Sequence, residues 1–203
     1  FQTIVMAISK EPKDAERQFL KTLKNDPEAW LPQLGMGIVL MRESKYPEAI
    51  SALKKARRVQ PEFPPILRTL GEAYLMDGQQ KKAARVLKTA LELNHGDKAA
   101  LFLMGTLYEE QGKTQKALRI FKKLSYLKPV RNNVYYHLGV CYGREKQLAL
   151  AHYNFGIYFK HSGRFQKAMF HFQKAKKLAS GNTALEEKIR KETEGVEEMK
   201  DQT

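Results

Sequence analysis

The segment Leu70-Gly71-Glu72-Ala73-Tyr74 returns with related residues every 34 positions along the chain. When each 34-residue unit is numbered so that this glycine is position 8, position 7 is Met or Leu and position 11 is Tyr or Leu. The glycines that align in this way are Gly37, Gly71, Gly105 and Gly139. Self-similarity at a fixed period of this length is typical of repeat proteins, in which each unit is one supersecondary element.

The second half of each unit repeats as well. Position 20 is alanine and position 24 is Leu or Phe, at Ala49, Ala83, Ala117 and Ala151 and at Leu53, Leu87, Phe121 and Phe155. Small residues at positions 8 and 20 predict two helices that cross closely, and larger residues fill the space around the crossing. Pro61 and Pro129 at position 32 end the second helix. The pattern resembles the tetratricopeptide repeat (TPR), which implies an all-α, right-handed superhelical solenoid of antiparallel helix pairs.

The register gives the expected boundaries. Residues 1–29 are a partial repeat, a linker helix followed by a second helix, and residues 30–179 form the TPR array. Its repeats are expected at 30–63, 64–97, 98–131, 132–161 and 149–179. The last two overlap because helix 148–161 fits both halves of the template: Ala151 and Phe155 suit a second helix, while Gly156 and Phe159 suit a first helix.

A C-terminal capping helix is expected at 183–199. The run Thr183-Ala-Leu-Glu186 reads as a capping box that opens it. Leu185, Ile189 and Val196 recur at helical spacing among charged residues, which is typical of a helix that covers the end of a repeat array.

No catalytic or metal-binding motif stands in the sequence. The five histidines form no His-Glu-x-x-His, and there is neither a phosphate-binding glycine loop nor a Gly-x-Ser-x-Gly. We therefore predict no catalytic residues, no metal and no cofactor for this chain, which is not expected to be an enzyme. The single cysteine, Cys141, is expected to be a small buried hydrophobic residue.

A binding groove is expected along the first helices of the repeats. In TPR proteins positions 2, 5, 6, 9, 12 and 13 of these helices line the concave face. Many are large and apolar here, although polar residues would suit a face that met only water. The candidate partner-binding residues are Leu31, Leu34, Ile38, Met41, Arg42, Arg68, Leu75, Met76, Phe102, Tyr136, His137, Arg144 and Tyr153. Burial against neighbouring helices is the alternative explanation for their apolar character.

Charge separates the outer surface from the end of the chain. The net charge is +14, although residues 182–203 are acidic. Basic residues recur on the second helices, for example Lys54, Lys88 and Lys122 at position 25. A solvated outer face explains this stripe, and an anionic membrane surface or an acidic partner is the alternative. Nucleic acid is not expected, because no aromatic stacking platform accompanies the stripe.

A narrower resemblance rests on Ala151-His-Tyr-Asn-Phe-Gly156-Ile-Tyr-Phe-Lys160, followed by Gly163, Ala168, His171, Phe172 and Ala175. This run is similar to the last repeat of bacterial His-Glu-x-x-His zinc metallopeptidases akin to the beta-barrel assembly-enhancing protease. The resemblance implies a substrate-recruiting or regulatory TPR domain, a periplasmic or membrane-associated location, and zinc ligands upstream of residue 1. Its partner would be an envelope protein or its own upstream peptidase domain. The alternative is a freestanding, cytoplasmic TPR scaffold that assembles a protein complex.

Overall fold

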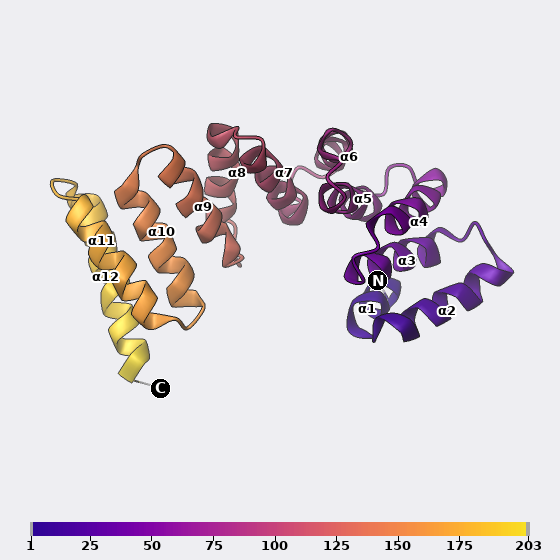
Figure 1. Ribbon diagram of the computed structural model, residues 1–203, viewed down its shortest axis with the longest axis horizontal. Helices are drawn as coiled ribbons and strands as arrows, with labels where there is room; N and C mark the ends of the chain where they lie inside the picture. Colours follow the sequence, from indigo (N-terminus) through magenta and orange to yellow (C-terminus); the bar gives the residue numbers. More distant parts are fainter. Residues whose placement is uncertain (1, 202–203) are drawn as a thin grey trace. The chain divides into compact units, whose positions relative to one another are not determined.

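The computed structural model describes residues 2–201, which form twelve α-helices and no strand (Figure 1). In chain order they are α1 (Gln2–Ser9), α2 (Pro12–Asn25), α3 (Trp30–Arg42), α4 (Tyr46–Val59), α5 (Pro64–Met76), α6 (Gln80–Leu93), α7 (Lys98–Glu110), α8 (Thr114–Tyr126), α9 (Asn133–Arg144), α10 (Leu148–His161), α11 (Phe165–Leu178) and α12 (Thr183–Asp201). The predicted all-α class is confirmed. No helix among the described residues has the length and apolar character that crossing a bilayer requires.

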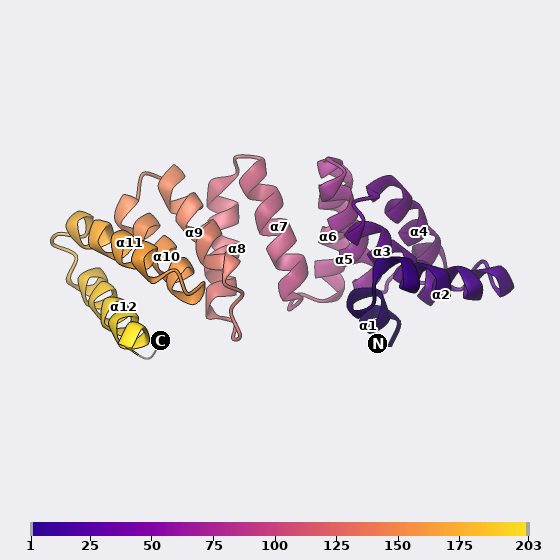
Figure 2. The ribbon, with the colours of Figure 1, turned by 60° about the horizontal axis from the view of Figure 1, so that its bottom comes forward.

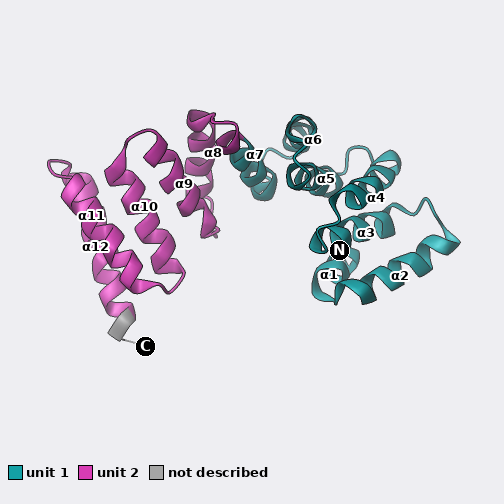
Figure 3. Cartoon of the chain, viewed as in Figure 1, with its two compact units in different colours: residues 1–107 teal, residues 108–203 magenta. Residues whose placement is uncertain are grey.

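The chain divides into two compact units, residues 1–107 and residues 108–203 (Figure 3). The division falls within α7, inside the repeat expected at 98–131. The sequence pattern, which continues in phase through this point, gave no sign of it.

In unit 1 the central element is α3, which contacts α1, α2, α4 and α5. Gly37 of α3 shows why glycine recurs at position 8. A Cβ added there would lie 2.5 Å from Cγ of Leu53 on α4. The same arrangement joins α5 to α6, where a Cβ at Gly71 would lie 2.6 Å from Cγ of Leu87. Position 8 therefore has to be glycine because the position-24 side chain occupies the space of a side chain there.

In unit 2 the helix expected to be shared packs on both sides, since α10 contacts α9 and α11 (Figure 2). Phe155 of α10 would lie 2.6 Å from a Cβ at Gly139 of α9. Phe172 of α11 would lie 2.4 Å from a Cβ at Gly156, which belongs to α10 itself. One helix thus supplies the aromatic residue for the repeat before it and the glycine for the repeat after it.

The turn inside each repeat has one geometry. The backbone at position 15 is left-handed at Ser44, Gly78, Gly112, Lys146 and Gly163, with φ between 59° and 72°. At position 16 the backbone N–H donates to the carbonyl of position 11 in all five, as in Lys45 to Leu40 at 2.8 Å. These bonds satisfy carbonyls that the end of the first helix leaves free.

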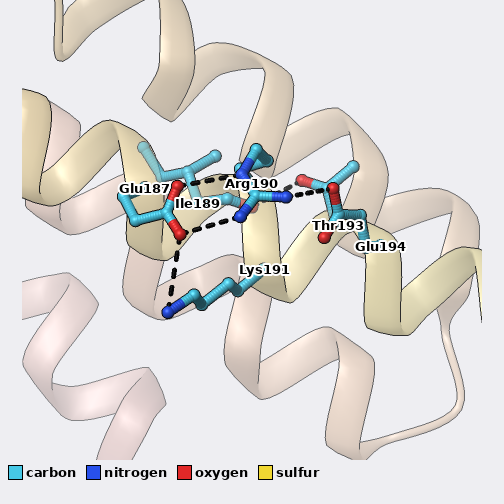
Figure 4. Close-up of polar contacts among 6 residues, drawn as sticks. All are labelled: Glu187, Ile189, Arg190, Lys191, Thr193 and Glu194. Carbon is cyan, nitrogen blue, oxygen red and sulfur yellow. Dashed lines mark hydrogen bonds and ion pairs between the residues drawn. The ribbon is translucent and has the colours of Figure 1, made fainter.

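The start of α12 differs from the predicted capping box. The side chain of Asn182, and not that of Thr183, caps the helix, because Asn182 Oδ1 accepts the N–H of Leu185 at 3.1 Å. Asparagine is as good an N-cap as threonine, and Thr183 then takes the first helical position. Within α12, Arg190 lies between Glu187 and Glu194 and donates to both, and Glu187 also pairs with Lys191 (Figure 4).

Candidate binding groove

A groove with a volume of about 400 Å³ opens on unit 1 between α1, α3 and α5, with one residue from the start of α4. Its lining residues are Ile4, Ile8, Ile38, Met41, Arg42, Tyr46, Arg68, Thr69, Glu72 and Met76. Two of the apolar side chains are largely solvent-exposed, Ile8 at 60% and Met76 at 53%. Apolar groups kept in water around a hollow are typical of a surface that binds a partner.

Five of the predicted groove residues line this hollow together, namely Ile38, Met41, Arg42, Arg68 and Met76. Leu31 is exposed but lies outside the lining, as do Leu75 and Phe102, which are half-buried. The prediction for Leu34 is wrong. Leu34 is 0% exposed, because α3 is surrounded by four helices, so this side chain belongs to the core.

The two arginines of the groove are held by neighbouring helices. Nη1 of Arg42 donates to the carbonyls of Ala7 and Lys10 at 2.9 and 2.6 Å, at the C-terminal end of α1. A cation there complements the negative end of the helix dipole. Nη1 of Arg68 donates to Oδ2 of Asp97 at 3.0 Å, while Oδ1 of Asp97 accepts the N–H groups of Ala99 and Ala100 at the start of α7.

Five lining residues were not among the candidates: Thr69 and Glu72 stand at the expected positions 6 and 9 of their repeat, and the other three lie outside the expected positions. Ile4 and Ile8 come from α1, which was treated only as the remnant of a repeat, and Tyr46 stands at the first residue of α4. The spacing of four between the two isoleucines puts them on one face of α1 and was the available signal. Arg42 of α3 fixes the end of that helix beside the groove.

The four predicted residues of unit 2 take part in internal contacts. Nδ1 of His137 lies 2.7 Å from Oε2 of Glu109, and the imidazole ring stacks on Phe121. Arg144 donates to the carbonyl of Glu109 at 2.6 Å, repeating what Arg42 does for α1. Tyr136 keeps 44% exposure beside Phe155 and Tyr158, so it is the one of the four with a large exposed ring.

Tyr153 lies beneath the terminal helix. It packs against the core cluster that contains Ile157 of α10 and Leu185, Ile189 and Val196 of α12. Burial, with the nearby Glu192 carboxylate, raises the pKa of its hydroxyl to about 12. Lys160 of α10 also reaches α12 and pairs with Glu192 at 2.9 Å. The capping helix therefore occupies the face of α10 that was expected to bind a partner.

Histidines meet between α10 and α11, although their sequence spacing gave no reason to join them. Nδ1 of His152 lies 2.9 Å from Nδ1 of His171, and Phe159 stacks on the His171 ring. Burial lowers the pKa of both imidazoles. The Lys174 ammonium lowers the pKa of His152 further, and positive charge on His152 lowers the pKa of His171 further. Among the described residues no group of three or more His, Cys, Asp or Glu comes together around a point that could hold a metal.

The cysteine and the basic residues of the second helices have structural roles or face solvent. Cys141 is fully buried, as predicted, and burial raises the pKa of its thiol to about 12, which keeps it protonated and unreactive. On the outer surface, Lys82, Lys116 and Lys167 at position 19 each lie over the position-11 ring of their repeat, at 5.6 to 5.7 Å from its centre. Part of the basic stripe thus covers aromatic rings.

Comparison with known protein families supplies the classification. Residues 15–135 match the family described as the cytochrome c-type biogenesis protein H TPR domain, and this span is more than half of the chain. The chain belongs to this TPR family. No curated protein matches this chain.

Solved structures resemble this TPR domain along most of its length. MamA is 25% identical with a TM-score of 0.66, and the match covers 77% of this chain and 91% of that one. MamA from Desulfovibrio magneticus RS-1 is 22% identical, with coverages of 85% and 88% and a TM-score of 0.63. YrrB, described as a TPR protein with an unusual peptide-binding site, is 17% identical, with coverages of 87% and 100% and a TM-score of 0.59. The last two likenesses show the fold alone.

Proposed function

We propose that this chain is a TPR module that binds a peptide segment of another protein, or of its parent protein, in the groove of unit 1. The observation that carries the proposal is the set of exposed apolar side chains around that groove, above all Ile8 and Met76. Binding would remove these side chains from water, which stabilises a complex by about 25 cal/mol for each Å² of apolar surface buried. The module acts by binding and contributes no catalytic group.

The similarity to YrrB supports peptide binding at the level of the fold, because that protein is described as having a peptide-binding site. The groove is also preorganised: Arg42 ties α1 to α3, and the Arg68–Asp97 pair ties α5 to the start of α7. A preformed site loses less conformational entropy when it binds.

The site can be tested by mapping where a peptide binds. Dodecapeptides selected from a random phage-displayed library on the purified chain would be titrated into isotopically labelled protein. Amide resonances of α1, α3 and α5 around the groove are expected to shift, while those of the outer faces of α4 and α6 stay in place. Shifts confined to the outer helices would contradict the proposal.

At a finer level we propose that the module recruits substrates or regulates activity in an envelope zinc metallopeptidase, with a periplasmic or membrane-associated location. The resemblance of residues 151–175 to the last repeat of such enzymes supports this, together with the half-repeat overlap at α10. The alternative is a freestanding scaffold for a multiprotein complex in the cytoplasm. An upstream His-Glu-x-x-His helix in the parent reading frame would favour the peptidase, and further repeats would favour the scaffold.

A further inference from the structure

Within the groove, Glu72 differs from the other charged residues. It stands at position 9 of α5, between Arg68 and Met76 on the same helix, and its side chain is half-buried. The structure gives its carboxylate no hydrogen bond and no ion pair with any residue in the described part of the chain. A carboxylate in an apolar hollow is a demanding group, because it needs a donor when water is excluded.

The nearby cations are directed elsewhere. Arg68, one helical turn before Glu72, turns to Asp97, whose side chain is only 7% exposed. Arg42 donates to the two carbonyls at the end of α1. In this structure, therefore, no described side chain of unit 1 donates to Glu72, and a partner that fills the groove would remove water from its carboxylate.

We propose that the groove selects an apolar segment that carries one lysine or arginine, and that Glu72 is the residue that selects this cation. The inference rests on the proposed function and adds the chemistry of the partner. It runs against the expectation from the net charge of +14, which would favour acidic partners everywhere. The basic outer helices still attract anions, whereas the groove presents apolar groups, the unpaired carboxylate of Glu72, and two arginines that are already bonded to the end of α1 and to Asp97.

The experiment uses the library-selected peptides on the full chain. We expect them to combine apolar residues with a Lys or Arg, and we expect a Lys→Glu analogue to bind at least about tenfold more weakly by calorimetry, because a partly desolvated charge pair is replaced by repulsion. The Glu72→Gln variant keeps the shape and should lose most of this discrimination. The Glu72→Lys variant should prefer the Glu-containing analogue.

Glu62→Lys is the matched control, since it changes the net charge equally at an exposed position outside the groove. It should keep the preference of the wild-type chain within about twofold, as expected for a screened surface charge. Two outcomes would overturn the inference: Glu72→Lys retains the wild-type preference, or Glu62→Lys shifts it as much. The proposed function would then still stand if the peptide binds at Ile8 and Met76. If no selected peptide reached the groove, both proposals would fail.

Discussion

At the scale of single residues, the turn at position 15 uses a left-handed backbone that glycine adopts without strain, while Ser44 and Lys146 adopt it with a β-carbon. A left-handed backbone costs a residue with a side chain about 1–2 kcal/mol, part of which is offset because glycine loses more entropy on folding. We therefore expect Lys146→Gly to raise the free energy of unfolding of unit 2 by about 0.5–1 kcal/mol. Urea denaturation followed by circular dichroism measures this, with Gly112→Ala as the control that should destabilise the same unit. Loss of stability in Lys146→Gly would contradict the shared turn geometry.

Two glycines of α9 allow a second comparison at this scale. A Cβ at Gly139 would lie 2.6 Å from Cε1 of Phe155, whereas a Cβ at Gly143 would come no closer than 4.0 Å, to Cβ of Ala151. Gly139→Ala should therefore destabilise unit 2 by about 1–3 kcal/mol through overpacking. Gly143→Ala should stabilise it by about 0.5 kcal/mol, because alanine is the better helix former. If the denaturation midpoint changed in the same direction in both variants, the predicted difference between the two glycines would be wrong.

At the scale of elements, the contact of α10 with α11 depends on two neutral imidazoles. The pKa values of His152 and His171 are lowered by burial, so the folded state binds fewer protons than the unfolded state below the ordinary histidine value of 6.5. Stability is therefore full above about pH 6.5 and is lost as the pH falls below it. We expect denaturation midpoints of unit 2 to fall between pH 7.5 and pH 5, and to fall less in His171→Phe, which keeps an aromatic ring beside Phe159. An equal fall in the variant would assign the effect to other groups.

Helices could be predicted where the residue pattern specifies how they pack against each other. Helix 148–161 was placed from Ala151, Phe155 and Gly156, and α10 spans Leu148–His161. The site was less predictable. Whether Leu34 is buried depends on how α1 and α2 meet α3, and whether Glu72 is unpaired depends on Arg68 turning to Asp97. The 34-residue repeat pattern predicts neither feature, because it specifies contacts within and between successive repeats but not the rotamer of a polar side chain.

At the scale of the whole molecule, charge and apolar surface occupy different places. The basic residues lie largely on the second helices, whereas in unit 1 the groove lies between the first helices α1, α3 and α5. In unit 2 the acidic helix α12 covers part of α10. We expect long-range attraction to act on the outer surface and to weaken with salt, since the Debye length falls from about 10 Å at 0.1 M salt to about 3 Å at 1 M. Binding in the groove should depend little on salt beyond the contribution of Glu72.

The central claim, that the groove of unit 1 is the working surface, is tested most directly by one calorimetric comparison. The affinity of a selected dodecapeptide would be measured for the Ile8→Ser/Met76→Ser double variant and for Val59→Ser/Leu93→Ser, which removes two similarly exposed apolar side chains outside the groove. Removing two interface anchors at about 1 kcal/mol or more each predicts a loss of at least about tenfold for the first variant, and the second should stay within about twofold of the wild-type chain. Equal affinities for the two variants, or a larger loss in the second, would contradict the claim.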